Sequence, residues 1–118
     1  MKVLILYLSI IISGVCYASE VDIIKVKAEL TSAQKYNISV TLKHADEGWE
    51  HYANSWRIYS PEGELLDERV LHHPHVKEQP FTRNILGVSV PRELSEVIIV
   101  AVCSKTGESK KSYTLKLR

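Results

Sequence analysis

Apolar and polar residues alternate along much of the chain after residue 20. Segments 24–30 and 36–42 place an apolar side chain at every second position, which is the period of a β-strand with one buried and one solvated face. Trp56 and Ile58 continue this pattern up to a run of turn residues at 60–63. The alternation therefore predicts strands, and no segment has the 3.6-residue period of a helix.

The same reasoning predicts seven short strands in all. They are expected at residues 24–30, 36–42, 56–59, 65–71, 81–90, 96–103 and 113–117. Seven strands at this spacing, with a tryptophan early in the third, indicate a single all-β domain: a two-sheet β-sandwich of immunoglobulin or fibronectin type III character. We expect Trp56 in the core between the sheets. A small closed barrel is the alternative, because alternation does not distinguish a closed sheet from open ones.

The N-terminal segment has the pattern of a secretory signal peptide. Lys2 supplies a positive start, and residues 3–12 form an apolar run of about ten residues, too short to anchor the chain in a bilayer. Cleavage is expected after Ala18, which divides the chain into a signal peptide (1–18) and one domain (19–118). The mature protein is therefore expected to be periplasmic or secreted, with no membrane span.

The two cysteines bear on both the leader and the domain. Cys16 offers an alternative reading of the leader as a lipoprotein signal, although the bulky Val15 before it disfavours lipid attachment. Removal of the leader leaves Cys103 alone, so the domain cannot form an internal disulfide. A single thiol of this kind is most often buried and inert, with pairing to another chain or metal ligation as the alternatives.

The charge of the mature domain excludes one class of partner. The whole chain has 15 Lys and Arg against 14 Asp and Glu, and the leader removes only Lys2, so the domain is formally neutral. No basic stripe is present to bind phosphates, and we expect no nucleic-acid partner.

All five histidines fall in one third of the chain. They are His44, His51, His72, His73 and His75. Neutral imidazole is the commonest transition-metal ligand in proteins, and nearby carboxylates are candidate ligands or partners of the rings. Those carboxylates are Asp46, Glu47, Glu50 and Glu78.

The pair His73 and His75 is the first candidate for a metal site. An extended backbone places both rings on the same side, with His72 on the other, and Pro74 stiffens the segment. A third ligand has to come from elsewhere, and His44 or His51 are the plausible donors. The simpler alternative is that the histidines make structural hydrogen bonds in loops.

No set of catalytic residues is recognisable. The sequence contains no Gly-x-Ser-x-Gly elbow, and Cys103 lies in an apolar strand with no motif that marks a nucleophile. We therefore expect a protein that is not an enzyme.

The chain contains the strings HADEGWEHYA at 44–53 and HPHVKEQPFTR at 73–83, with Trp56 and Pro61-Glu62-Gly63 between them. In these features it resembles a family of small exported bacterial proteins of unassigned function. The resemblance covers most of the mature chain and implies an exported domain without implying an activity. The sequence departs near Cys103, where such proteins tend to have a His-Asp pair and a Gly-rich loop. If the family's site uses that histidine, either Cys103 replaces it as a softer ligand or the site is lost.

These observations favour an exported binding module for a transition metal, copper or zinc. The expected ligands are His51, His73, His75 and Cys103. The alternative is a structural or protein-interaction sandwich that binds a partner protein through the loop at 44–54 and the segment at 72–83.

Overall fold

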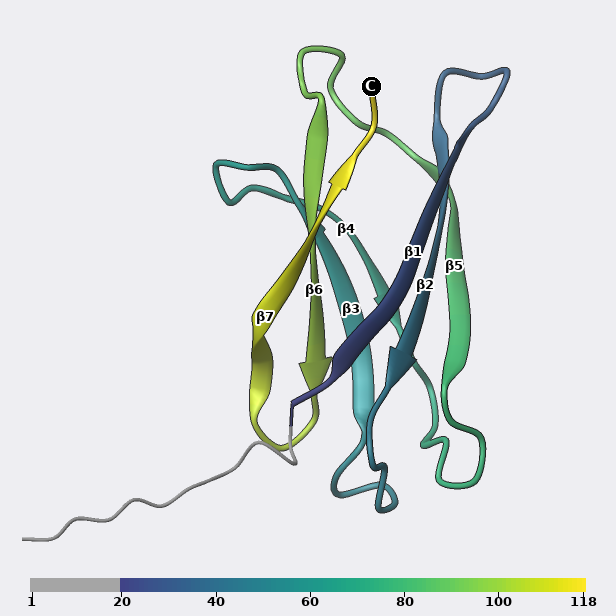
Figure 1. Ribbon diagram of the computed structural model, residues 1–118, viewed down its shortest axis with the longest axis vertical. Helices are drawn as coiled ribbons and strands as arrows, with labels where there is room; N and C mark the ends of the chain where they lie inside the picture. The colour runs from purple at the N-terminus through teal and green to yellow at the C-terminus, as the bar shows by residue number, and fades with distance from the viewer. Residues whose placement is uncertain (1–19) are drawn as a thin grey trace, which may run out of the picture.

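Seven antiparallel strands form two sheets in the computed structural model, which describes residues 20–118 (Figure 1). The strands are β1 (Asp22–Leu30), β2 (Tyr36–Lys43), β3 (Ala53–Tyr59), β4 (Leu65–Val70), β5 (Phe81–Val88), β6 (Glu96–Cys103) and β7 (Gly107–Lys116). The signal peptide and the lipoprotein alternative concern residues 1–18 and lie outside the described residues. Residues 20–118 contain no helix able to cross a bilayer.

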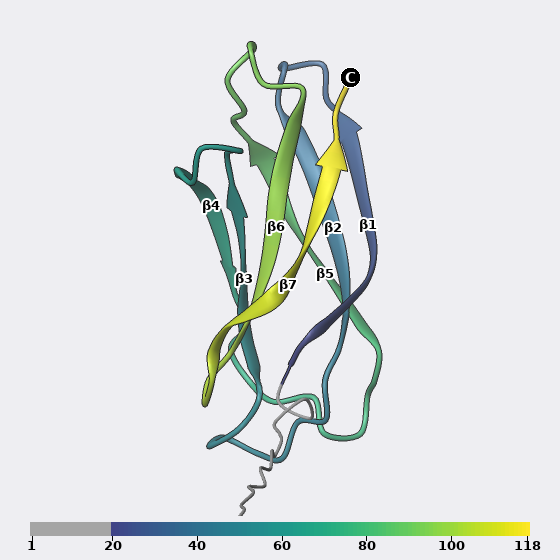
Figure 2. The same ribbon diagram turned by 60° about the vertical axis from the view of Figure 1, so that its left-hand side comes forward.

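The strands divide into a three-stranded sheet, in the order β1-β2-β5, and a four-stranded sheet, in the order β4-β3-β6-β7. The two sheets pack face to face as two layers (Figure 2). The predicted two-sheet sandwich is thereby confirmed, and residues 20–118 do not close into a barrel. The further likeness to immunoglobulin or fibronectin type III domains stays a prediction.

The core lies between the two sheets, as the alternation requires. In β2 the buried positions are every second residue from Tyr36 to Leu42, and in β3 both Trp56 and Ile58 have an exposed fraction of 0%. Trp56 lies opposite Ala101 in the pairing of β3 with β6. The prediction that Trp56 occupies the core is confirmed.

Strand β1 departs from the predicted pattern. Ile24 and Leu30 were expected on the buried face, but their exposed fractions are 53% and 54%. The pairing of β1 with β2 shifts register between Ile23 and Lys25, so Ile23, and not Ile24, packs against the core. A one-residue shift of this kind moves side chains to the opposite face of a strand.

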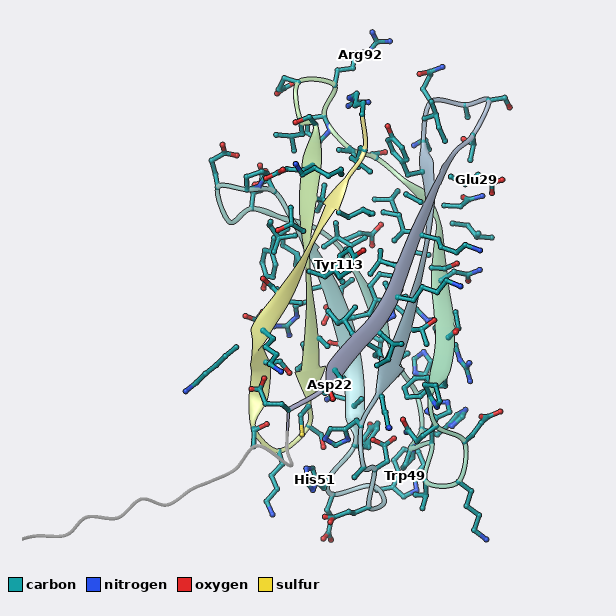
Figure 3. The ribbon with its side chains drawn as sticks, in the orientation of Figure 1. Asp22, Glu29, Trp49, His51, Arg92 and Tyr113 are labelled. Carbon is teal, nitrogen blue, oxygen red and sulfur yellow. The ribbon has the colours of Figure 1, made fainter. Side chains whose placement is uncertain are left out.

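One end of the sandwich carries most of the residues singled out from the sequence. The loop between β2 and β3 (44–52), the loop between β4 and β5 (71–80) and the turn between β6 and β7 (104–106) all lie at this end. His51 and Trp49 mark it at the bottom of Figure 3. Loops at the end of a rigid sandwich are a common location for functional residues.

Candidate metal centre

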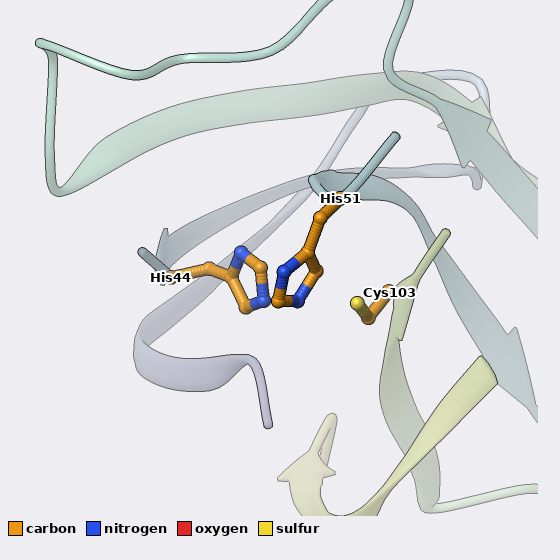
Figure 4. A group of neighbouring side chains, drawn as sticks. All are labelled: His44, His51 and Cys103. Carbon is orange, nitrogen blue, oxygen red and sulfur yellow. The ribbon is translucent and has the colours of Figure 1, made fainter. Parts of the chain in front are cut away.

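Three potential metal ligands from three parts of the chain meet at this end of the sandwich. His44 follows the last residue of β2, His51 lies two residues before β3, and Cys103 is the last residue of β6. One ligand atom from each lies within 4.8 Å of the other two, and Figure 4 shows the three side chains turned toward one another. We call this group the His2Cys cluster.

The His44 ring is held from behind by a buried carboxylate. Its Nδ1 lies 2.6 Å from Oδ1 of Asp46, and both side chains are fully buried. The same Oδ1 accepts a hydrogen bond from the backbone N–H of Ala53, and Oδ2 accepts one from the N–H of His75. Asp46 therefore fixes the ring and also joins the start of β3 to the loop at 71–80.

The His51 ring is held in the same way by Glu47. A tight turn, in which Gly48 has a φ of 119°, brings His51 back beside Glu47, since the N–H of Glu47 donates to the carbonyl of His51. A positive φ of this size favours glycine. Nδ1 of His51 lies 2.7 Å from Oε1 of Glu47, and this hydrogen bond lowers the pKa of the Glu47 carboxyl.

The other ring nitrogen of His51, Nε2, is not held by a hydrogen bond of this kind within residues 20–118. Nε2 is buried and has no hydrogen-bond partner among the described residues. Because Nδ1 faces a carboxylate, the neutral ring carries its proton on Nδ1 and presents a lone pair at Nε2. A buried lone pair without a donor costs free energy unless another group binds it.

Cys103 supplies the third potential ligand. Cys103 is 1% exposed. It lies opposite Ala53 in the pairing of β6 with β3, and this pairing places its side chain close to the segment that carries His51. The backbone N–H of Lys105 donates to Sγ over 3.5 Å. The thiolate is the form of a cysteine that binds metals.

The spacing of the two imidazole rings agrees with binding to a common ion. Their centroids are 5.0 Å apart and the rings are inclined at 76°. When nitrogens bind at about 2.0 to 2.1 Å, two imidazoles placed tetrahedrally or trigonally around one ion have centroids roughly 5 to 5.5 Å apart. The observed separation lies at the lower end of that range.

The pair His73 and His75 is arranged differently. The rings do lie on the same side, with centroids 4.7 Å apart, but neither belongs to the His2Cys cluster. The ring of His75 is stacked on Phe81, and its Nε2 lies 2.9 Å from a guanidinium nitrogen of Arg83. Since Arg83 donates this hydrogen bond, Nε2 is occupied.

The surroundings of His75 oppose a bound cation. A neutral ring that accepts at Nε2 carries its proton on Nδ1, so neither nitrogen presents a free lone pair. Burial, the charge of Arg83 and the nearby His73 together lower the pKa of His75 and keep its ring neutral. The structure thus separates two of the four expected ligands, His73 and His75, from the other two.

Part of this arrangement was predictable from the sequence. His51 and Cys103 were among the expected ligands, and His44 was one of two plausible third donors. Asp46 and Glu47 were among the carboxylates expected beside the rings. Two short spacings each place a carboxylate within reach of a ring nitrogen, His44-Ala45-Asp46 and Glu47 to His51. The first of them is the signal that would have selected His44.

Comparison with known proteins adds one relative. A protein of Halomicrobium mukohataei named "Putative lipoprotein" is 31% identical over 80 residues, which is 68% of this chain and 39% of that protein. The chain thus spans well under two thirds of that relative's length. No protein-family profile matches the sequence, and no solved structure matches it.

Proposed function

We propose that this protein is an exported module that binds a transition-metal ion, copper or zinc, through Nε2 of His44, Nε2 of His51 and Sγ of Cys103. The observation that carries the proposal is the buried Nε2 of His51, which has no hydrogen-bond partner within residues 20–118, on a ring that meets His44 and Cys103 with one ligand atom of each within 4.8 Å of the others. Three ligands bound at 2.0 to 2.3 Å are separated by roughly 3.3 to 4 Å, so small side-chain movements close the site.

The carboxylates behind both rings support the same proposal. Metal-bound histidines usually donate their other nitrogen to a carboxylate or carbonyl, which fixes the ring and makes it a better ligand. Asp46 and Glu47 do this at 2.6 and 2.7 Å. Histidines that only make hydrogen bonds in loops do not need two such carboxylate-held rings side by side.

Cys103 beside a histidine with a carboxylate partner also resembles the arrangement of a thiol nucleophile. The thiol of such an enzyme has to reach a substrate, and Cys103 is almost fully enclosed. We therefore propose a binding function without catalysis.

Export of the domain is part of the proposal. It rests on the leader pattern at 1–18 and on the relative named as a lipoprotein. We propose a periplasmic or secreted location, with lipid attachment at Cys16 as the alternative.

A protein-interaction role is the second candidate. Trp49 and Val76, in the two loops expected to contact a partner, have exposed fractions of 67% and 54%. Exposed apolar side chains at one end of a domain suit a docking surface. This role becomes the better account if the metal titration below fails.

The test is a titration of the purified mature protein with Zn(II), Cu(II) and, under a reductant, Cu(I) at pH 7.5. We expect one ion per chain with a dissociation constant below about 10 μM. His51→Ala and Cys103→Ser each remove a proposed ligand and are expected to weaken binding by at least about 100-fold.

Two control variants separate this cluster from the other histidines. His72→Ala changes an exposed ring, and the double change His73→Ala with His75→Gln removes the alternative pair while keeping an acceptor for Arg83. Both are expected to bind as tightly as the wild type. Loss of binding in the double variant, with normal binding in His51→Ala, would contradict the proposal.

A further inference from the structure

We propose that the ion held by the His2Cys cluster is copper, bound in both the Cu(I) and Cu(II) states without a change of protein ligands. This inference rests on the proposed metal-binding function and goes beyond it, because that function does not distinguish copper from zinc. Four features of the cluster favour copper.

The first feature is the composition of the ligand set. Two imidazoles and one thiolate, from His44, His51 and Cys103, make up the set found at trigonal copper centres, in which a weak axial contact completes the coordination. On any set of nitrogen and sulfur ligands, Cu(II) also binds more tightly than Zn(II).

The second feature is the number of ligands. Zinc is almost always four-coordinate, and a zinc site with three protein ligands completes its shell with water or substrate. The His44 and His51 side chains are 0% and 12% exposed, and Cys103 is equally enclosed. Enclosed ligands suit an ion that is satisfied by three strong bonds better than one that needs a solvent-accessible fourth position.

The third feature is charge. Neutral imidazoles and one thiolate make Cu(I) a neutral centre, whereas Cu(II) leaves one positive charge. The carboxylates of Asp46 and Glu47 hydrogen-bond to the backs of the two rings and offset that charge. The added positive charge of the Cu(II) state is therefore not left uncompensated in a buried position.

The fourth feature is the environment of the sulfur. The N–H of Lys105 donates to Sγ of Cys103, and hydrogen bonding at the cysteine sulfur is one of the factors that set the potential of copper–thiolate centres. The rings are fixed from behind and Cys103 sits in the sheet ladder. Gain or loss of one electron at the ion thus demands little rearrangement of the protein.

The test uses the purified mature protein and aqueous Cu(II) and Zn(II) salts as probes. One equivalent of Cu(II) is expected to produce an intense visible absorption from thiolate-to-copper charge transfer. Ascorbate should remove the band by giving one electron to Cu(II), and ferricyanide should restore it by taking that electron back. Copper should also displace one equivalent of bound zinc, with an affinity at least about tenfold higher.

Cys103→Ser is the matched control, because it changes only the sulfur to oxygen and keeps both histidines. It should lack the charge-transfer band at every copper concentration. His72→Ala should keep the band at wild-type intensity.

The outcomes separate this inference from the proposed function. Zinc bound as tightly as copper, or copper bound without the band, would overturn the copper inference and leave a metal-binding module. Absence of binding by either ion would overturn both. A band that bleaches while disulfide-linked dimers appear would also overturn the inference, because two Cu(II) ions would then have oxidised two Cys103 thiols to one disulfide.

Discussion

Trp56 is the largest side chain that the two sheets enclose completely. Its replacement by alanine removes the whole indole ring from the core and leaves a cavity, so we expect Trp56→Ala to lower the free energy of unfolding by about 3–5 kcal/mol. Urea denaturation followed by circular dichroism measures this loss. A loss below about 1 kcal/mol would mean that Trp56 does not hold the sheets together.

A second variant separates volume from polarity at the same position. Nε1 of Trp56 is buried and has no hydrogen-bond partner among the described residues. Trp56→Phe removes this donor and leaves a smaller cavity, and we expect a clearly smaller loss than for alanine.

At the scale of single residues, the sequence predicted which residue types are able to bind a metal better than it predicted which side chains lie together. His51, Cys103, Asp46 and Glu47 were all identified as residues of interest, because their types suit metal binding. The pairing of His75 with Arg83 was not predictable, since it depends on how the loop at 71–80 folds back over β5. Residue type indicates what a side chain is able to bind, and only the fold shows which partner it meets first.

At the scale of strands, a charged network links three strands of the four-stranded sheet. Arg57 on β3 contacts Glu68 on β4 at 2.9 Å and Glu108 on β7 at 2.8 Å, and the hydroxyl of Tyr59 also donates to Glu108. These hydrogen bonds lower the pKa of both carboxyls. A carboxyl whose pKa is lowered by folding stabilises the fold above its unfolded-state pKa and loses that contribution as the pH falls.

This network predicts a pH-dependent effect of Glu108→Gln. At pH 7 the variant should be less stable than the wild type by about 0.5–1 kcal/mol, because the side chains are partly exposed and solvent screens the pair. The difference should shrink as the pH falls below about 4.5, the ordinary value for this carboxyl, and through its lowered folded-state pKa. Denaturation curves over this range test the effect, with Glu62→Gln in an exposed turn as the control; an unchanged difference at pH 3 would contradict it.

The proposed metal joins the two sheets. His44 follows β2 of the three-stranded sheet, whereas His51 precedes β3 and Cys103 ends β6, both strands of the other sheet. An ion bound only by the folded protein raises the free energy of unfolding by about 2.7 kcal/mol at a free concentration of 100 times the dissociation constant. Thermal unfolding with and without copper should show this increase in the wild type, and a similar increase in Cys103→Ser would contradict a bridging role for the sulfur.

Element positions were largely predictable, and the errors have identifiable causes. Strict alternation in β2 fixed its inward face, because every second residue is apolar. In β1 the adjacent apolar residues Ile23 and Ile24 left the inward face ambiguous, and the register shift decided it. Strand β7 begins at Gly107, well before the predicted 113, because its first half pairs with β6 through polar residues that carry no alternation.

At the scale of the whole molecule, the leader predicts a processed N-terminus. The intact mass of the exported protein should correspond to a start at Ser19, because Ala18 precedes the expected cleavage position. A diacylated species beginning at Cys16 would instead support lipid attachment. Either result leaves residues 20–118 and the His2Cys cluster unchanged.

The molecule as a whole is a two-sheet sandwich with the His2Cys cluster at one end, where β2 and β6 end and β3 begins. The two sheets were predictable from strand number and alternation. The convergence of His44 with Cys103 was not, because 59 positions along the chain separate them and they lie at the ends of β2 and β6, which are in different sheets, so that only the packing of the two sheets brings them together.

X-ray absorption spectroscopy at the copper edge of the copper-loaded protein measures the proposed ligand set itself. We expect one sulfur at about 2.2–2.3 Å and two imidazole nitrogens at about 2.0 Å from the ion, with the sulfur absent in Cys103→Ser. A shell of nitrogen and oxygen alone in the wild type would contradict it.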